Sequence, residues 1–325
     1  MKKALITGIN GQDGSYLAEL LLDKGYKVYG ILKRNSVAEN QTARIEHLYP
    51  EIKHNLYHAD MTDMASLFSV IKETEPNEIY NLAAQSHVMV SFKEPIYTME
   101  TIAKGTLNLL ELIRLIDPKI KLYQASSSEM FGNSCDEDGF QRETTPMNPV
   151  SPYACSKLCA FNLVKCYREA YNLFASNGIL FNHESPRRGT TFVTNKVVRE
   201  AVRIYKGLST KITLGNLDSR RDWGHAKDYV HMMWAMLQLE KPEDYICATG
   251  ISKSVRDLCE YTFGELGMDY RDYVEQDSKF MRPLELKNLR GCADKLKKDT
   301  NLDMNYTFET MLDEMIDYWM RNIHA

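Results

Sequence analysis

The residues Ala4-Leu5-Ile6-Thr7-Gly8-Ile9-Asn10-Gly11-Gln12-Asp13-Gly14 join a short apolar run to three glycines in GxxGxxG spacing, and a helical pattern follows over residues 16–22. A glycine turn between a strand and a helix lets backbone amides and the positive end of the helix approach a pyrophosphate, which a Cβ atom would hold away. The pattern therefore predicts a dinucleotide-binding site, with the candidate residues Gly8, Asn10, Gly11, Gln12 and Asp13.

Strand and helix patterns alternate outward from this turn over the first 180 residues. Strands are predicted at 27–32, 56–59, 78–84 and 121–125, and helices at 64–73 and 98–116. This alternation is typical of βαβ units, so we expect an α/β fold with a doubly wound parallel sheet of the Rossmann type. After Pro186 the segments become shorter, with helices predicted at 193–205, 226–239, 254–266 and 308–319, which indicates a smaller α/β C-terminal domain.

The composition excludes several classes of protein. Forty Lys and Arg against 44 Asp and Glu leave a net charge of −4 over 325 residues, too balanced for an electrostatic nucleic-acid binder. No apolar run reaches the roughly 18 residues of a membrane span, and the first residues lack the features of a signal peptide. Seven cysteines without a CxxC pair favour neither a disulfide framework nor a metal site. We expect a cytoplasmic protein, with Cys155, Cys159 and Cys166 buried along one side of a helix.

The end of the second predicted strand favours NADP over NAD as the cofactor. NAD enzymes typically place Asp or Glu there to bind the ribose hydroxyls. This chain instead has Arg34, Asn35 and Ser36, and a guanidinium can pair with a 2′-phosphate through two hydrogen bonds. Because ligands of such sheets lie at the carboxyl ends of the strands, the ends of the third and fourth strands add the candidates Asp60, Met61, Leu82, Ala83, Ala84, Gln85 and Ser86.

Tyr153 and Lys157 are the candidates for the chemical step. They stand at i and i+4 at the start of a predicted helix, so their side chains share one face. A tyrosine with a pKa of about 10 is a poor base at neutral pH. We expect the Lys157 ammonium and a cationic nicotinamide ring to lower the pKa of Tyr153, which could then take a hydroxyl proton as a hydride leaves.

Longer stretches of the chain resemble the GDP-mannose 4,6-dehydratase family, which belongs to the extended short-chain dehydrogenases/reductases that act on nucleotide sugars. The matching stretches are Thr7–Leu17, Asn81–Val88, Gly178–Gly189 and Leu214–Val230, the last around Arg221-Asp222-Trp223-Gly224-His225. The resemblance implies an NADP-dependent hydro-lyase that converts GDP-mannose to GDP-4-keto-6-deoxymannose and water. This reaction is the first step toward deoxysugars of the GDP-fucose and GDP-rhamnose type.

The resemblance also implies a role for each catalytic residue. Tyr153 takes the O4 proton while a hydride leaves C4 for NADP⁺, and the resulting ketone makes the C5 proton acidic. Glu129, which matches the family's glutamate, removes that proton; the C6 hydroxyl departs and the hydride returns to C6. Ser127 stands where the family usually has threonine, so the hydroxyl is kept and the methyl group is lost. Lys157 holds the nicotinamide ribose.

The same matching implies further binding residues and a division of the chain. Tyr97, His183 and Arg188 would contact the cofactor. The nucleotide sugar would be held by Ser86, Asn182, Lys196, Asn216, Arg221, Arg282 and Glu285, of which the two arginines suit its pyrophosphate. Residues 1–182 with roughly 218–250 would form the NADP-binding domain, and residues 183–217 with roughly 251–325 the nucleotide-sugar domain.

Several alternatives stay open at this stage. Residues 267–281 are shorter than the family's usual stretch before Arg282-Pro283-Leu284-Glu285, which affects the expected guanosine contacts. A nucleotide-sugar 4-epimerase or 4-keto reductase would also use Tyr153 and Lys157, but a simple epimerase needs no base at Glu129. A protein that only senses NADP has no need for these three residues together. In the predicted helices at 107–116 and 158–167, apolar residues occupy more than the single stripe that a helix needs to cover a sheet. Because the remaining apolar residues could be buried against a second copy, we expect a homodimer or a tetramer.

Overall fold

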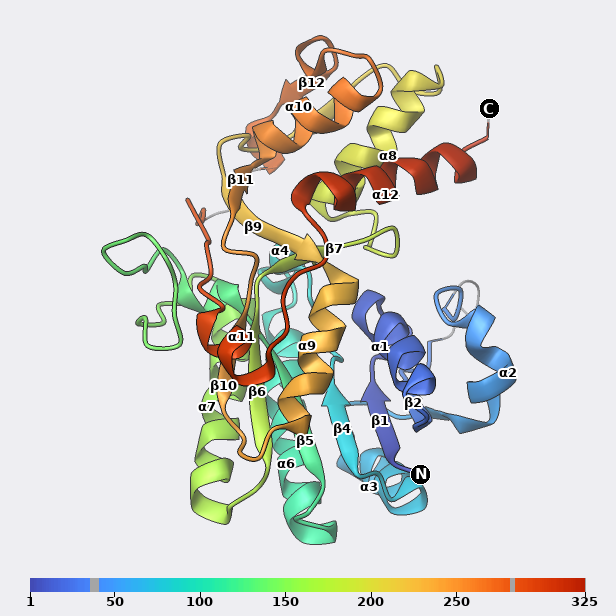
Figure 1. Ribbon diagram of the computed structural model, residues 1–325, viewed down its shortest axis with the longest axis vertical. Helices are drawn as coiled ribbons and strands as arrows, with labels where there is room; N and C mark the ends of the chain where they lie inside the picture. Colours follow the sequence, from blue (N-terminus) through green and yellow to red (C-terminus); the bar gives the residue numbers. More distant parts are fainter. Residues whose placement is uncertain (36–40, 281–283, 325) are drawn as a thin grey trace.

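The computed structural model describes residues 1–35, 41–280 and 284–324, which form a larger and a smaller unit (Figure 1). The described part of the larger unit is built on a seven-stranded sheet of order β10-β6-β5-β4-β1-β2-β3 whose neighbouring strands all run parallel. The strands are β1 (Lys3–Thr7), β2 (Lys27–Leu32), β3 (Leu56–His58), β4 (Glu78–Asn81), β5 (Lys121–Ser127), β6 (Ala175–Leu180) and β10 (Asp244–Cys247). The predicted doubly wound parallel sheet is confirmed.

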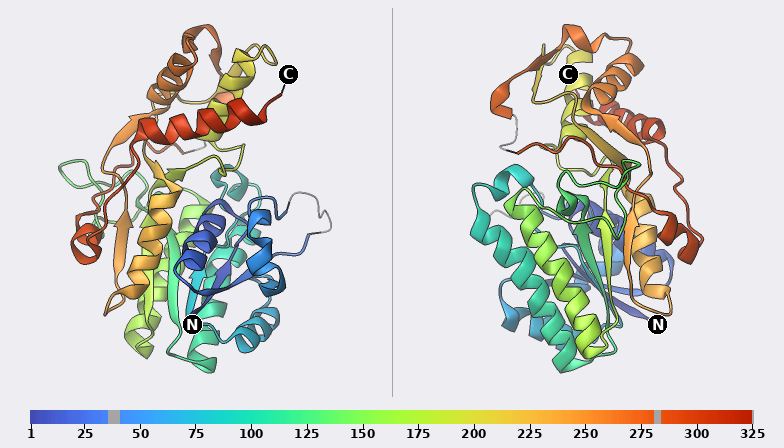
Figure 2. Two further views of the ribbon diagram at one scale, coloured as in Figure 1. Left: turned by 45° about the vertical axis from the view of Figure 1, so that its right-hand side comes forward. Right: turned by 90° about the vertical axis from the view of Figure 1, so that its left-hand side faces the viewer.

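Helices cover both faces of this sheet (Figure 2). One face carries α3 (Met64–Thr74), α6 (Gly105–Ile116) and α7 (Pro152–Tyr171), and the other carries α1 (Gln12–Asp23) and α9 (Ala226–Gln238). The helix α5 (Pro95–Met99) passes through a π-helical turn, η3 (Glu100–Lys104), into α6. Shorter helices are α2 (Tyr49–Ile52), α4 (Val88–Ser91) and α11 (Asp294–Thr300), and η4 (Ser128–Phe131) is a 3₁₀ turn that follows β5.

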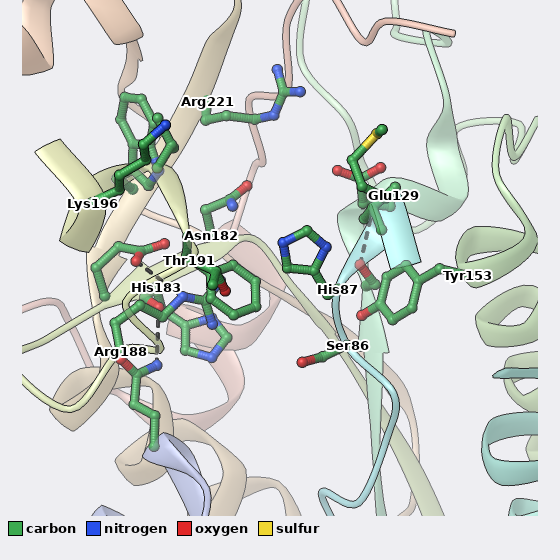
Figure 3. A pocket seen from close by; sticks show the side chains of 18 of the residues that line it. Ser86, His87, Glu129, Tyr153, Asn182, His183, Arg188, Thr191, Lys196 and Arg221 are labelled. Carbon is green, nitrogen blue, oxygen red and sulfur yellow. Dashed lines mark hydrogen bonds and ion pairs between the residues drawn. The ribbon is translucent and has the colours of Figure 1, made fainter. Parts of the chain in front are cut away.

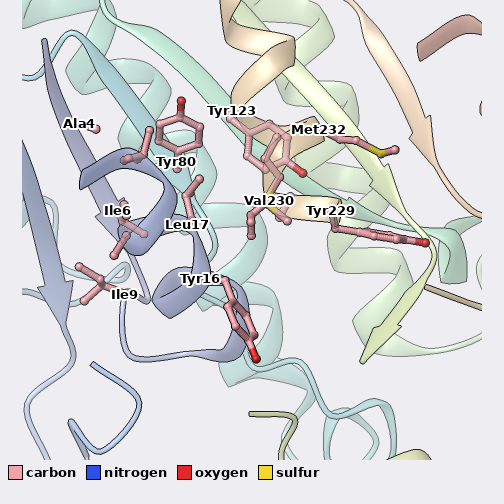
Figure 4. Packing of buried hydrophobic residues seen from close by; sticks show 14 of the residues in the cluster. Ala4, Ile6, Ile9, Tyr16, Leu17, Tyr80, Tyr123, Tyr229, Val230 and Met232 are labelled. Atoms are coloured by element: carbon pink, nitrogen blue, oxygen red, sulfur yellow. The ribbon is translucent and has the colours of Figure 1, made fainter. Parts of the chain in front are cut away.

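The strands of the large sheet are short apolar runs because helices bury both faces of the sheet. Ala4 and Ile6 of β1 lie in the same cluster as Leu17 of α1 and Val230 of α9 (Figure 4). Leu5 points the other way and packs in the cluster of α3 and α6. Because both faces of a parallel sheet are covered, its strands appear in the sequence as continuous apolar runs rather than as alternating ones.

The smaller unit lies over the carboxyl ends of the large sheet, at the top of Figure 1. Its helices α8 (Val193–Tyr205), α10 (Val255–Glu265) and α12 (Phe308–Asn322) share one hydrophobic core. Its strands form a sheet of β7 (Asn182–Glu184), β9 (Arg220–His225) and β11 (Ser252–Ser254), and a pair of β8 (Ile212–Leu214) and β12 (Val274–Gln276). One part of the predicted nucleotide-sugar domain, α11, packs on the larger unit instead, with Leu296 in the core beneath α9.

Two element boundaries at the front of the sheet differ from the prediction. Helix α1 begins at Gln12, inside the glycine-rich stretch, rather than at residue 16. Strand β4 ends at Asn81 rather than at residue 84, because the backbone amides of Leu82 and Ala83 donate to the Thr7 hydroxyl at 3.0 and 3.1 Å and leave the strand ladder. Both differences bring backbone toward the same edge of the sheet.

The expectation that three cysteines of α7 are buried is wrong. Cys155, Cys159 and Cys166 are all exposed, and α7 buries Ala160 and Val164 instead. Among the described residues, no helix combines the length and the apolar character that a bilayer crossing requires.

Candidate active site

A cavity of about 920 Å³ opens where both units meet at the carboxyl ends of the large sheet (Figure 3). Strands β1 and β4 are neighbours there although β2 and β3 separate them in the chain, so the cavity lies where the strand order reverses, the usual ligand site of such sheets. The predicted site residues that line it are Gly8, Gly11, Gln12, Asp13, Leu82, Ala84, Ser86, Ser127, Glu129, Tyr153, Lys157, Asn182, His183, Arg188, Lys196, Asn216, Arg221 and Glu285. Ser36 and Arg282 lie outside the described residues.

The glycine turn has the shape that a pyrophosphate site requires. Gly8 has a φ of +69°, which favours glycine, and its carbonyl accepts from the Gly11 amide at 2.9 Å. A Cβ atom at Gly14 would lie 2.4 Å from the Gly8 carbonyl oxygen and 2.6 Å from the Ile9 Cα. The lack of a side chain at Gly14 thus lets α1 pack closely on the turn, and the N-terminal amides of α1 favour an anion. A dinucleotide fits this part of the cavity.

Two polar residues of α1 connect the turn to the smaller sheet. Gln12 donates to the His183 carbonyl at 3.1 Å and accepts from the Ser185 hydroxyl at 2.8 Å. Asp13 pairs with the Nε2 of His183 at 2.9 Å. Burial raises the pKa of Asp13, but His183, Gln12 and Arg188 together outweigh it and lower that pKa to about 2. The pKa of His183 is raised, since Asp13 outweighs the effect of burial on the ring. This pair fixes β7 against the start of α1.

Another group of predicted cofactor residues lies beyond the lining of the cavity, near the ends of β2 and β3. Lys33 pairs with Asp60 at 3.0 Å and donates to the Tyr97 hydroxyl at 2.8 Å, so these three side chains form one cluster. Arg34 and Asn35 follow Lys33 and are exposed. Three other predicted cofactor residues make hydrogen bonds within the chain. Asn10 donates to the Gln41 carbonyl, the Met61 carbonyl accepts from Asn108, and Gln85 donates to Thr98. Ala83 follows the end of β4.

Tyr153, Ser127 and Glu129, three of the predicted catalytic residues, line the same cavity. Ser151 caps α7 by accepting from the Ala154 amide, and Pro152 follows at the first helical position, which places Tyr153 in the first turn facing β5. The Ser127 hydroxyl accepts from the Glu129 amide at 3.2 Å and hydrogen-bonds Tyr153. Burial raises the pKa of Tyr153 to about 12, against the hydrogen bond from Ser127, and the nearby charge of Glu129 adds to the increase.

Lys157 does not lower the pKa of Tyr153 as the sequence analysis expected. Its ammonium donates to the Ala125 carbonyl at 2.6 Å and lies 5.9 Å from the centre of the Tyr153 ring. Burial lowers the pKa of Lys157 to about 8. In the chain alone the buried phenol is therefore a weaker acid than usual, although Ser127 and the charge of Arg188 act against the effect of burial. The positive charge of an oxidised nicotinamide ring would lower the pKa of Tyr153 further.

The predicted nucleotide-sugar residues come from both units. Asn182 lies on β7, and Lys196 on α8 donates to the Thr213 carbonyl at 2.6 Å. Arg221 on β9 is buried and donates to the Leu286 carbonyl at 3.0 Å. The Asn216 side chain accepts from the Asp218 amide at 2.9 Å. The other members, Ser86 and Glu285, line the cavity from the end of β4 and from residues 284–289, and Glu285 accepts from the Ser219 hydroxyl at 3.4 Å.

The model of the GDP-mannose 4,6-dehydratase family matches residues 5–315. The chain belongs to this family. It is 51% identical to GDP-mannose 4,6 dehydratase 2 of Arabidopsis thaliana, over 97% of this chain and 86% of that protein. It is 47% identical to the human GDP-mannose 4,6 dehydratase, over 96% and 90%. The solved dTDP-glucose 4,6-dehydratase of Bacillus anthracis, in complex with NAD, superposes with a TM-score of 0.84 at 26% identity over 99% and 97%.

In this member of the GDP-mannose 4,6-dehydratase family, the described residues 267–280 contribute to the wall of the cavity. The segment contains β12, which pairs with β8, and the next turn, η6 (Ser278–Phe280), supplies Lys279 and Phe280 to the wall. The Lys196 ammonium lies 4.6 Å from the centre of the Phe280 ring.

Other lining residues were missed by the sequence analysis. Arg188 pairs with Glu184 at 3.1 Å and lies over the Phe192 ring, so Glu184 and Phe192 join the site through it. His87 lines the cavity directly after the predicted Ser86. The position of His87 after the small residues that end β4 is a signal that could have found it, whereas Phe192 carries none.

Proposed function

We propose that this chain is an NADP-dependent GDP-mannose 4,6-dehydratase that forms GDP-4-keto-6-deoxymannose and water. The observation that supports this function best is one cavity that joins a dinucleotide turn to Tyr153, Ser127 and Glu129. Oxidation at C4 needs an acceptor for the O4 proton, and elimination needs a second base for the C5 proton. Tyr153 and Glu129 supply the two groups, and the charge of one affects the other.

The residues would act in a fixed order. Bound NADP⁺ would supply the acceptor for the hydride from C4 and, once reduced, its donor to C6. Tyr153 takes the O4 proton and then hydrogen-bonds the ketone oxygen, with Ser127 holding the phenol in place. Glu129 takes the C5 proton, which the ketone has made acidic. Lys157, anchored on the Ala125 carbonyl, would reach the nicotinamide ribose with its remaining N–H groups.

The cofactor and the nucleotide sugar would enter from different sides of the cavity. The pyrophosphate of NADP would lie against Gly8–Gly14, and its 2′-phosphate would meet Arg34 after β2. GDP-mannose would extend toward the smaller unit, where the Arg221 guanidinium and Lys196 suit its diphosphate. The division of the chain into a cofactor domain and a nucleotide-sugar domain remains part of this proposal, with α11 counted in the former and β9 in the latter.

We also propose that the enzyme is cytoplasmic and that two or four copies assemble. Its seven cysteines are all free, as is common in a reducing compartment. Most of the apolar residues of α6 are buried in the chain's own core, but Leu115 is 62% exposed, and Ile96 of α5 is 72% exposed. These two side chains and the three exposed cysteines of α7 lie on helices that contact one another, and a second copy could cover them.

One assay tests the function. The protein is incubated with GDP-mannose and catalytic NADP⁺, and the sugar product is analysed while absorbance at the NADPH band is followed. We expect a 4-keto-6-deoxy sugar nucleotide with no accumulation of NADPH, because the hydride returns within each turnover. A C4 epimer as product, or stoichiometric NADPH, would instead assign the chain to another reaction of nucleotide sugars.

A further inference from the structure

The proposed elimination requires a proton donor for the departing C6 hydroxyl. Glu129 acts as a base at C5, and Tyr153 holds the proton from O4 next to the ketone. The C6 hydroxyl is a poor leaving group unless it receives a proton as the C–O bond breaks. The residue after Glu129 is Met130, and those before it are serines, which are weak acids. A titratable group on another wall of the cavity would supply this proton while Glu129 holds the one from C5.

We propose that His87 is the acid that protonates the departing C6 hydroxyl, an inference that rests on the proposed dehydratase function. His87 lines the same cavity as Glu129 and Tyr153. The next residue, Val88, packs with Ala84 against the cluster that contains Tyr153, and α4 contacts α7. In Figure 3 the imidazole of His87 extends into the cavity between Asn182 and the pair Glu129 and Tyr153.

The position of the His87 ring is set by its neighbours. The Gln85 side chain holds the backbone on both sides, because its Oε1 accepts from the His87 amide at 2.8 Å and its Nε2 donates to the His87 carbonyl at 3.2 Å. The same Nε2 donates to Thr98 of α5 at 3.2 Å. The imidazole lies 5.4 Å from the Phe192 ring, centre to centre, at 50°. The ring is thus held between the end of β4 and the loop before α8.

The chemistry balances with His87 in this role. The C5–H electrons form the C5–C6 double bond as the C6–O pair leaves, and a His87 imidazolium N–H gives its proton to that oxygen, which departs as water. The hydride then returns to C6, and C5 regains a proton from Glu129. One turnover leaves Tyr153 with one proton more and His87 with one fewer, so a single proton must pass between them through solvent. Imidazole suits this exchange because it gains and loses a proton near neutral pH.

A change of leaving group tests the proposal. In GDP-6-deoxy-6-fluoromannose the leaving group is fluoride, which departs without needing a full proton. We expect His87→Gln and His87→Phe to lower the rate with GDP-mannose at least about 10²-fold, and to leave the rate with the fluoro sugar close to that of the wild type. The fluoro sugar should not rescue Glu129→Gln, because the C5 proton must still be removed. His54→Gln, on an exposed histidine of the larger unit, is the matched control.

The outcomes separate this inference from the function on which it rests. If the wild type does not dehydrate GDP-mannose, the proposed function fails. If the wild type does so and the His87 variants lose equal activity on both sugars, or lose none on either, His87 is not the acid. Retained activity in His87→Phe alone would show that the ring only packs against Phe192, and would also overturn the proposal.

Discussion

Tyr153 and Glu129 act on different atoms of the sugar in the proposed reaction, so their variants should stop at different steps. Glu129→Gln keeps the size of the side chain but removes the basic oxygen. We expect dehydration to decrease about 10²- to 10⁴-fold while hydride transfer from C4 persists. Tyr153→Phe should stop hydride transfer itself, since the O4 proton then has no acceptor. A single turnover in deuterated water measures both steps, as bound NADPH and as deuterium at C5. Rapid exchange at C5 in Glu129→Gln would show that another residue is the base.

Arg34 is the residue on which we propose that the choice of NADP depends. It follows Lys33, whose ammonium is already paired with Asp60 and Tyr97, so Arg34 is the better placed of the two for a 2′-phosphate. Arg34→Asp would put a carboxylate against that phosphate and should weaken NADP binding far more than NAD binding. Titration of both cofactors measures the ratio of their dissociation constants. Equal losses for the two cofactors would contradict the assignment.

The pair of the partly buried Asp13 and the buried His183 should give the fold a particular dependence on pH. Because the pKa of Asp13 is lowered to about 2, its contribution is present above pH ~4 and is lost as the pH falls through about 2. Because the pKa of His183 is raised, its contribution is present below pH ~6.5 and is lost as the pH rises through the raised value. Asp13→Asn should cost about 1–3 kcal/mol of unfolding free energy near pH 5 and less on either side.

Urea unfolding of the cofactor-free protein at several pH values measures this difference. Asp23→Asn, at the exposed far end of the same helix, is the control and should change the unfolding free energy little. A cost of Asp13→Asn that stays constant from pH 3 to pH 8 would show that the pair contributes no charge interaction.

At the scale of elements, the turn from β1 into α1 depends on the absence of one Cβ atom. A methyl group at Gly14 would collide with backbone atoms of Gly8 and Ile9, which cannot move without opening the turn. We expect Gly14→Ala to destabilise the fold by several kcal/mol or to abolish NADP binding. Gly264, inside α10, has no neighbour within 4 Å of its Cβ position, so Gly264→Ala should stabilise by up to about 1 kcal/mol. Unfolding curves and cofactor titrations compare the two.

The elements were predictable from the sequence where a local pattern defines them. The strand β2 and the helix α8 have the predicted bounds, because apolar spacing and the residues at their ends suffice to place them. The pairing of His183 with Asp13 and the bond from Lys157 to Ala125 were not predictable. Each joins residues that are distant in the chain and depends on the depth at which a side chain is buried. The burial of α7 was misjudged for the same reason, since the helix turns alanine and valine inward and its thiols outward.

At the scale of the whole molecule, the proposed reaction is shared between the two units. The larger unit supplies the glycine turn and the acid–base groups, whose positions are fixed by the ends of parallel strands. The smaller unit supplies two cationic groups, Arg221 on β9 and Lys196 on α8. Gln12 and Asp13 connect them by binding residues 183–185, so the two sides of the cavity are held by buried hydrogen bonds as well as by the chain itself.

The assembly of copies is the last prediction, and it concerns the outer surface of α5, α6 and α7, where α6 and α7 lie side by side (right view of Figure 2). Over about three turns α7 exposes Cys155, Cys159 and Cys166, and Ile96 of α5 and Leu115 of α6 are exposed on the neighbouring helices. Covering apolar area contributes about 25 cal/mol per Å², so a charge placed there should weaken association strongly. We expect the wild type to sediment as a dimer or larger at micromolar concentration, and Cys159→Glu with Leu115→Glu to sediment as a folded monomer. Ile251→Glu, on an equally exposed apolar residue beside β11, should leave the assembly intact. A monomeric wild type, or an equal loss in the Ile251 variant, would remove this surface as the site of association.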